Sequence, residues 1–209
     1  MYKIKEIYYT IQGEGFHTGR PAVFIRFSGC NLWNGLEKDR KGAICNWCDT
    51  DFVGTNGING GKHSALKIKD IVTNVWLINE SAKPYVILTG GEPLLQVDEH
   101  LINILHDAGF EIGLETNGTI VPPNGIDWIC VSPKANAKLK LNKGNELKIV
   151  YPQCGINPIV YENLEFDYFY IQPMDGKNQE LTIKKSENFI MKHPKWRLSL
   201  QTHKILGIP

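Results

Sequence analysis

Five short apolar runs constrain the fold of this chain more than any other feature of its sequence. They are Tyr85 to Leu88, Ile112 to Leu114, Trp128 to Val131, Leu147 to Val150 and Tyr168 to Ile171. Apolar runs of this length, without polar alternation, are typical of strands that are buried on both faces of a parallel sheet. The middle of the chain is therefore predicted to form such a sheet.

Helical patterns separate some of these runs. Apolar residues recur at helical spacing from Ile68 to Trp76, from Val97 to Ala108 before Gly109, and more weakly from Ile183 to His193. The interval from Gly118 to Trp128 contains Pro122 and Pro123 and is too short for a crossover helix. Further strands are predicted at Lys3 to Tyr9, Ala22 to Phe27 and Leu198 to Leu200. The pattern predicts an α/β fold, an incomplete (β/α) barrel of about six parallel strands with fewer helices than strands.

Composition narrows the class of protein. With 209 residues, of which 42% are hydrophobic, the chain is expected to form one domain, residues 1–209. Its 23 basic and 22 acidic residues indicate no nucleic-acid partner. It shows neither a signal peptide nor an apolar run approaching ~18 residues, so no membrane association is expected. We expect a cytoplasmic, reducing compartment, where clustered cysteines are more often metal ligands than disulfides.

Three of the five cysteines are clustered, at Cys30, Cys45 and Cys48. Three thiolates leave one coordination position open, both in a tetrahedral zinc site and in a [4Fe-4S] cluster. A structural zinc site would need a fourth ligand, for which Cys130, Cys154 and His63 are candidates. Spacing alone leaves zinc, iron–sulfur and redox sites open.

Polar residues follow four of the predicted strands. They are Thr89 to Glu92, Glu115 to Asn117, Ser132 to Lys134 and Gln172 to Asp175. Any one set could be a turn or a helix cap. Four in succession predict a ligand site, because the carboxyl ends of parallel strands converge at one edge.

Two features near the N-terminus add to this site. The turn Gln12 to Gly15 contains two glycines, which a tight loop alone would explain. Arg26 lies inside the apolar strand VFIRF. Its guanidinium either reaches the surface or is buried with an anionic partner.

The cysteine cluster and the turn Thr89 to Pro93 together resemble the radical S-adenosylmethionine superfamily. The usual spacing there is Cx3Cx2C, and the fourteen-residue gap in this chain narrows the resemblance to a subgroup. With Gln12 to Gly15, Cys48 to Thr50 and Gln201 to Lys204, the chain resembles the 7-carboxy-7-deazaguanine synthase family over nearly its whole length.

This resemblance implies cofactors and site residues. Cys30, Cys45 and Cys48 would hold a [4Fe-4S] cluster, and Thr50 would bind Mg²⁺, although Cys48 to Thr50 could equally be a capping turn. The resemblance implies that S-adenosylmethionine is bound by Gly91, Glu115, Ser132, Pro133, Lys134, Gln172, Pro173, Met174 and Asp175. It implies that the pterin substrate is bound by Ile11, Gln12, Gly13, Glu14, Arg26, Thr89, His203 and the carboxylate of Pro209.

The implied reaction converts 6-carboxy-5,6,7,8-tetrahydropterin to 7-carboxy-7-deazaguanine with loss of ammonia, a step toward queuosine-type bases. An external electron donor such as flavodoxin and a homodimer are implied as well. Two other classes of protein stay open. A zinc-stabilised binding module would contain zinc and no iron, whereas a ferredoxin-like electron carrier would need a fourth clustered cysteine and fewer residues.

Overall fold

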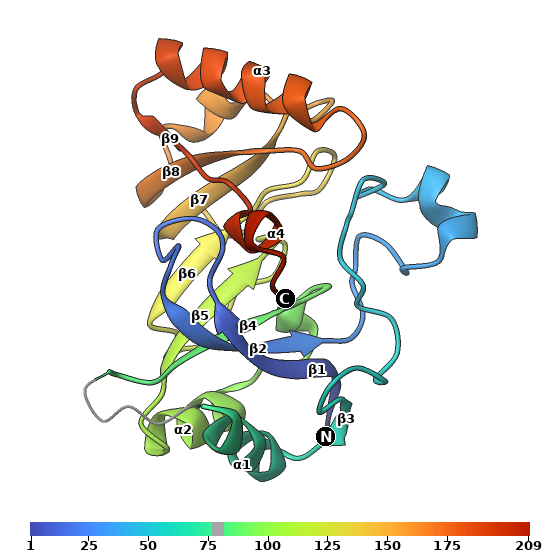
Figure 1. Cartoon of the computed structure of the whole chain (residues 1–209), viewed down its shortest axis with the longest axis vertical. Coiled ribbons are helices and arrows are strands. Elements are labelled where there is room, and N and C mark those ends of the chain that lie inside the picture. The colour runs from blue at the N-terminus through green and yellow to red at the C-terminus, as the bar shows by residue number, and fades with distance from the viewer. Residues whose placement is uncertain (77–81) are drawn as a thin grey trace.

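One nine-stranded sheet runs through the computed structural model, which describes residues 1–76 and 82–209 (Figure 1). The strands are β1 Tyr2–Ile11, β2 Pro21–Phe27, β3 Gly61–His63, β4 Tyr85–Gly90, β5 Glu111–Thr116, β6 Trp128–Val131, β7 Lys143–Tyr151, β8 Glu165–Pro173 and β9 Trp196–Leu198. Their order is β3-β1-β2-β4-β5-β6-β7-β8-β9. Neighbours from β2 to β9 are parallel, and β1 is antiparallel to both β2 and β3. The predicted parallel sheet is confirmed, with an antiparallel extension at one edge.

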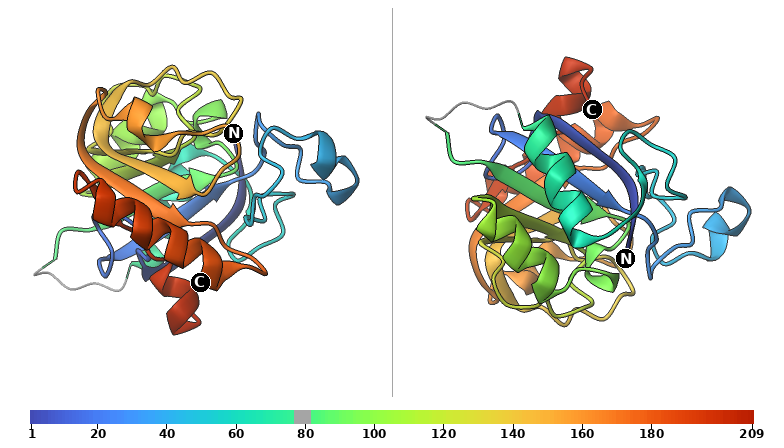
Figure 2. Two further views of the ribbon diagram at one scale, coloured as in Figure 1. Left: turned by 90° about the horizontal axis from the view of Figure 1, so that it is seen from above. Right: turned by 90° about the horizontal axis from the view of Figure 1, so that it is seen from below.

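Helices are fewer than strands in the described residues, as predicted. The α-helices are α1 Ala65–Val75, α2 Glu99–Asp107, α3 Gln179–Lys192 and α4 Thr202–Leu206, and the 3-10 helices are η1 Glu37–Gly42, η2 Pro93–Leu95 and η3 Pro158–Tyr161. The connection from β5 to β6, which contains Pro122 and Pro123, has no helix. Helices α1 and α2 lie together at one end of the sheet and α3 lies at the other (Figures 1 and 2). No helix in the described part of the chain is long and apolar enough to cross a membrane.

Local capping sets the helix boundaries. The side chain of Ser64 accepts a hydrogen bond from the Lys67 N–H at 3.2 Å, and that of Asp98 accepts one from the Leu101 N–H at 3.0 Å. Gly109 follows α2 with φ 86°, the left-handed conformation that ends a helix.

Three predicted boundaries are wrong by a few residues. Because Asp98 caps α2, this helix begins at Glu99 and not at Val97. Helix α3 begins at Gln179, one turn before Ile183, and the last strand is Trp196–Leu198.

Both faces of the sheet carry apolar side chains, as predicted, because Ala22, Tyr85 and Ile87 form a cluster on the face opposite Val86 and Leu88. The outer residues pack beneath the helices in two clusters, which include Val86, Leu88 and Ile112 in the first and Leu147, Ile149 and Ile171 in the second. Polar side chains point inward near the carboxyl ends of the strands: Arg26, Thr89, Glu115, Lys148 and Gln172. The curled sheet therefore surrounds an interior that is polar near the carboxyl ends of its strands.

Candidate active site

The three clustered cysteines open into one cavity at the carboxyl edge of the sheet. The thiols of Cys45 and Cys48 are hydrogen-bonded to each other, which raises the pKa of Cys45 and lowers that of Cys48. The loop between Cys30 and Cys45 carries η1 and projects away from the sheet (Figures 1 and 2). Cys130 is buried in β6 and Cys154 is exposed, and neither lines this cavity.

The turn after β4 brings the sheet against the cysteine loop. A Cβ atom on Gly90 would overlap the Phe27 carbonyl, and one on Gly91 would overlap the Gly29 carbonyl beside Cys30. Only glycine permits so close an approach of two backbones.

Glu92 holds this turn from within the protein. Its fully buried carboxylate accepts hydrogen bonds from the Leu94 N–H at 3.0 Å, the Asn117 N–H at 2.8 Å and the Thr116 hydroxyl at 2.8 Å. The carboxylate is therefore satisfied by the chain itself and does not face the cavity.

The residues predicted to bind S-adenosylmethionine line the same cavity as the cysteines, with one exception. The structure places there Gly91, Glu115, Ser132, Lys134, Gln172, Pro173, Met174 and Asp175. Pro133 is buried and does not line the wall, so its predicted contact lacks support in this geometry. Lys134 donates to both oxygens of Ser132, at 2.6 and 2.7 Å, which fixes its ammonium near the thiols.

An adjoining cavity gathers the residues predicted to contact the substrate. Its wall includes Ile11, Gln12, Gly13, Glu14, Arg26, Thr89, His203 and Pro209. The two cavities share Glu14, Asp49, Thr50, Thr89, Glu115 and Gln201. They are therefore two halves of one continuous site.

Thr50 lies between the two halves. No helix begins after it until α1 at Ala65, so the capping-turn interpretation of Cys48 to Thr50 is wrong. The neighbouring Asp49 is held by Lys204 at 2.6 Å and by the Gln201 amide at 3.3 Å. The Thr50 hydroxyl is 3.4 Å from Asp49 Oδ1.

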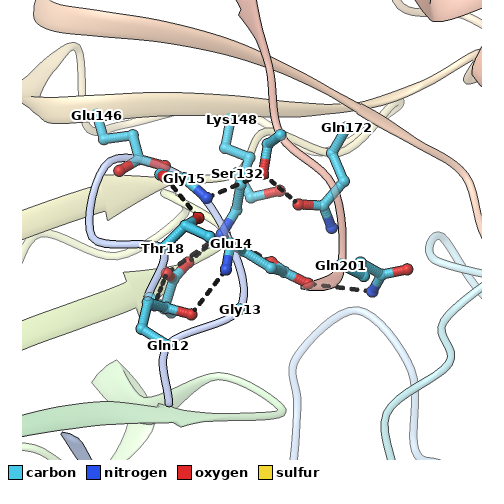
Figure 3. A network of polar contacts seen from close by, with 12 residues as sticks. Gln12, Gly13, Glu14, Gly15, Thr18, Ser132, Glu146, Lys148, Gln172 and Gln201 are labelled. Atoms are coloured by element: carbon cyan, nitrogen blue, oxygen red, sulfur yellow. Dashed lines mark hydrogen bonds and ion pairs between the residues drawn. The ribbon is translucent and has the colours of Figure 1, made fainter. Parts of the chain in front are cut away.

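A buried lysine, Lys148, lies beside Glu14 at the boundary between the cavities (Figure 3). Lys148 Nζ lies 2.8 Å from Glu14 and 3.0 Å from Glu115, and its side chain is 4% exposed. Although burial opposes ionisation of Glu14, contacts with Lys148 and Gln201 lower its pKa. Burial also opposes a charge on Lys148, but its acidic neighbours raise its pKa well above the ordinary value.

Sequence reasoning missed Lys148. The signal was present, because a lysine within the apolar run LKIV is the same anomaly as Arg26 within VFIRF. Gln201 and Lys204 belong to a sequence motif near the end of the chain, but their contacts with Asp49 are visible only in the structure.

Arg26 is partly buried and has an anionic partner inside the chain. Its Nε donates to Glu6 at 2.7 Å and its Nη2 to the Tyr8 hydroxyl at 2.8 Å. All three residues line the second cavity. The guanidinium is thus held in place at the cavity wall by groups of β1.

The last turn of the chain covers the second cavity. The backbone N–H and the hydroxyl of Thr202 both donate to the Gly13 carbonyl at 2.9 Å. The Thr10 hydroxyl donates to Pro209 O at 2.9 Å. The imidazole of His203 packs against Gly13, where a Cβ atom would overlap it. Helix α4 was not predicted, and it is what brings His203 and Pro209 to the cavity.

Comparison with known proteins identifies the family. A 7-carboxy-7-deazaguanine synthase from Bradyrhizobium diazoefficiens is 54% identical to this chain over 208 residues, which cover 99% of each protein. One from Burkholderia multivorans is 53% identical over 209 residues, covering all of this chain and 99% of that protein. This chain belongs to the 7-carboxy-7-deazaguanine synthase family. No family model matches the chain.

Structure comparison agrees with this assignment at the level of the fold. The crystal structure of QueE from Escherichia coli matches with a TM-score of 0.67 at 24% identity, covering 95% of this chain and 93% of that one. The predicted incomplete barrel and the predicted enzyme class are confirmed. Membership in the 7-carboxy-7-deazaguanine synthase family implies radical S-adenosylmethionine chemistry on a small-molecule substrate.

Proposed function

We propose that this enzyme converts 6-carboxy-5,6,7,8-tetrahydropterin to 7-carboxy-7-deazaguanine and ammonia in the formation of queuosine-type bases. The observation that supports this most strongly is the continuity of the two cavities. The three thiols line one, the pterin residues expected for the family line the other, and Thr50 and Glu115 belong to both. Cofactors held beside the thiols would then lie next to a substrate in the second cavity.

The donor set of the first cavity fits a [4Fe-4S] cluster. Cys30, Cys45 and Cys48 would each hold one iron, which leaves the fourth iron for S-adenosylmethionine. When bound, this pair of cofactors supplies a 5′-deoxyadenosyl radical that can take a hydrogen atom from carbon. The residues that could have completed a zinc site, His63, Cys130 and Cys154, do not line the cavity. Among the described residues, no group of three or more His, Cys, Asp or Glu side chains is arranged to hold one metal ion. The three candidates for a fourth zinc ligand are therefore absent from this cavity, which supports the cluster.

The chain itself binds, orients and shields the substrate. Gln12 and Glu14 present an amide and a carboxylate to the second cavity, and Lys148 keeps Glu14 ionised. A carboxylate accepts well from the N–H donors of a pterin ring. Pro209 and His203 are proposed to contact the same ring.

We also propose that Thr50 donates its hydroxyl to a magnesium ion between the cavities. Mg²⁺ keeps several waters and takes few protein ligands. One hydroxyl and the substrate carboxylate, together with water molecules, would therefore be enough ligands to bind it. Thr50→Val should retain the cluster and cofactor cleavage but lose most of the rate increase that Mg²⁺ produces. Turnover measured across a Mg²⁺ titration checks this. Thr55→Val, outside both cavities, is the control, and an unchanged Mg²⁺ response in Thr50→Val would contradict the assignment.

Arg26 is proposed to hold the carboxylate of the substrate while Glu6 fixes its other side. Arg26→Lys keeps the charge but loses the planar fork. A lost charge-assisted hydrogen bond is worth ~1.5–3 kcal/mol, so KM for the pterin should rise roughly tenfold or more. Arg20→Lys is a matched control, because Arg20 forms a bidentate salt bridge with Glu111 outside both cavities. Its Nη1 and Nη2 donate to the two carboxylate oxygens at 2.9 and 3.0 Å. Equal KM values for wild type and Arg26→Lys would disprove the pairing.

The deciding experiment for the proposed function is anaerobic reconstitution with iron and sulfide, followed by incubation with the tetrahydropterin, S-adenosylmethionine and a reductant. Chromatography should show 7-carboxy-7-deazaguanine, and ammonia should appear in equal amount. Stoichiometric zinc, no iron uptake and no product would instead favour the binding module.

An external electron donor such as flavodoxin, a homodimer and a single domain over residues 1–209 are part of the same proposal.

A further inference from the structure

A small chamber lies behind the substrate cavity, inside the curled sheet. It has a volume of about 10 Å³, which is room for about one molecule the size of water. Glu14 and Glu115 line both the chamber and the substrate cavity. The chamber is therefore the next space inward from the place where the pterin is proposed to react.

Two residues of the chamber wall each have a buried polar atom without a hydrogen-bond partner in the described part of the chain. These atoms are Oε1 of Glu146 and Nε2 of His17. Glu146 is 2% exposed, and its other oxygen accepts the Phe16 N–H at 3.1 Å. Its carboxylate lies against Gly15 at the end of the substrate turn (Figure 3). A buried oxygen that accepts no hydrogen bond destabilises the folded protein. A hydrogen-bond donor with a single heavy atom would fit the chamber and satisfy this oxygen.

The charges around the chamber favour a cation. Three carboxylates, those of Glu14, Glu115 and Glu146, line the chamber. The nearby cations are Lys148 and also Arg20, which lies over the Tyr85 ring and is paired with Glu111 at 2.9 Å. Lys148 lies at hydrogen-bond distance from Glu14 and Glu115, and the ion pairs found among the described residues do not include one between Lys148 and Glu146. Burial raises the pKa of Glu146, against the opposing effects of Lys148 and of contacts with Phe16 and Cys130.

Aromatic rings complete the wall. Trp128 and Tyr85 line the chamber, with ring centroids 4.4 and 5.3 Å from that of His17. The Arg20 guanidinium lies 3.9 Å from the Tyr85 ring centroid, so the argument for a cation rests on the acceptors. Carboxylate and imidazole acceptors suit an ion that carries only donors.

We propose that this chamber is a binding site for one ammonium ion, the leaving group of the reaction, held between Glu146 Oε1 and His17 Nε2. The inference rests on the proposed function for the source of the ammonium. The site separates the leaving group from the reacting ring, and no covalent step takes place in it. Free ammonium at high concentration should occupy the same place and slow turnover.

Rubidium, a monovalent ion close to ammonium in size, tests the site without any need for activity. Crystals grown with RbCl should show an anomalous difference peak between Glu146 Oε1 and His17 Nε2. The peak should be absent in Glu146→Gln, which keeps the shape of the side chain and removes its charge. A wild-type crystal without the peak, or with only water there, overturns the proposal even if the enzyme makes the expected product.

Inhibition provides a second measurement. Ammonium chloride should inhibit turnover more strongly than tetramethylammonium chloride, which is too large for the chamber. In Glu146→Gln the inhibition constant for ammonium should rise at least fivefold, whereas in Glu165→Gln, exposed on the surface, it should not change. Equal inhibition of all three proteins overturns the proposal, and absence of product in wild type with a rubidium peak present would reject the proposed function and not the ion site.

Discussion

Cys30→Ala, Cys45→Ala and Cys48→Ala are each expected to leave the protein without its [4Fe-4S] cluster and without activity. All three thiols line one cavity, and each would be the sole protein ligand of one iron. Loss of one thiolate leaves an iron exposed to water and to oxidation. Iron and sulfide content after anaerobic reconstitution, together with the brown colour of the protein, measures the effect.

The remaining cysteines provide the controls. Cys154 is exposed and Cys130 is buried in β6, so Cys154→Ala and Cys130→Ala should take up iron as wild type does. Full cluster content in any one of the three clustered variants would remove that cysteine from the ligand set. Zinc binding in place of iron in wild type would reject the whole assignment.

Lys148→Met is expected to be the most damaging single substitution outside the cysteines. It removes the ammonium that lies 2.8 Å from Glu14 and 3.0 Å from Glu115 and leaves two partly buried carboxylates without a cation. Breaking a buried ion pair in this way costs ~3–5 kcal/mol. In a chain of this size that corresponds to a fall in Tm of roughly 6–20 °C. Thermal unfolding and turnover are the measurements, and turnover should be lost.

A double substitution separates charge from packing. Glu14→Gln combined with Lys148→Met removes one carboxylate along with the ammonium, so it should recover a large part of the lost stability but not the activity. Lys143→Met, at the exposed start of the same strand, should change neither the thermal stability nor the turnover. If the double variant were no more stable than Lys148→Met, the ion pair would not be the source of the loss.

Much of the fold follows from local patterns in the sequence. Buried strands, amphipathic helices and the helix-free connection at Pro122 and Pro123 depend on side chains a few residues apart, so their positions were predicted closely. The glycines of the turn after β4 were also recognisable, although the reason for them, backbone contact with the loop of Cys30, is tertiary. Most residues assigned by resemblance line the two cavities, with Pro133 as the exception.

The sequence by itself determined which apolar runs are buried and which three thiols lie close along the chain. It also marked the charged residues that stand inside apolar strands. Only the tertiary structure decided which charges meet. Sheet register and curling bring Lys148 between Glu14 and Glu115, and they set Glu6 beside Arg26. Docking of α4 brings Lys204 to Asp49, although these residues are far apart in the sequence. Hydrophobic periodicity reports the environment of each residue separately, whereas a buried ion pair depends on the relative placement of two elements, which no local pattern encodes.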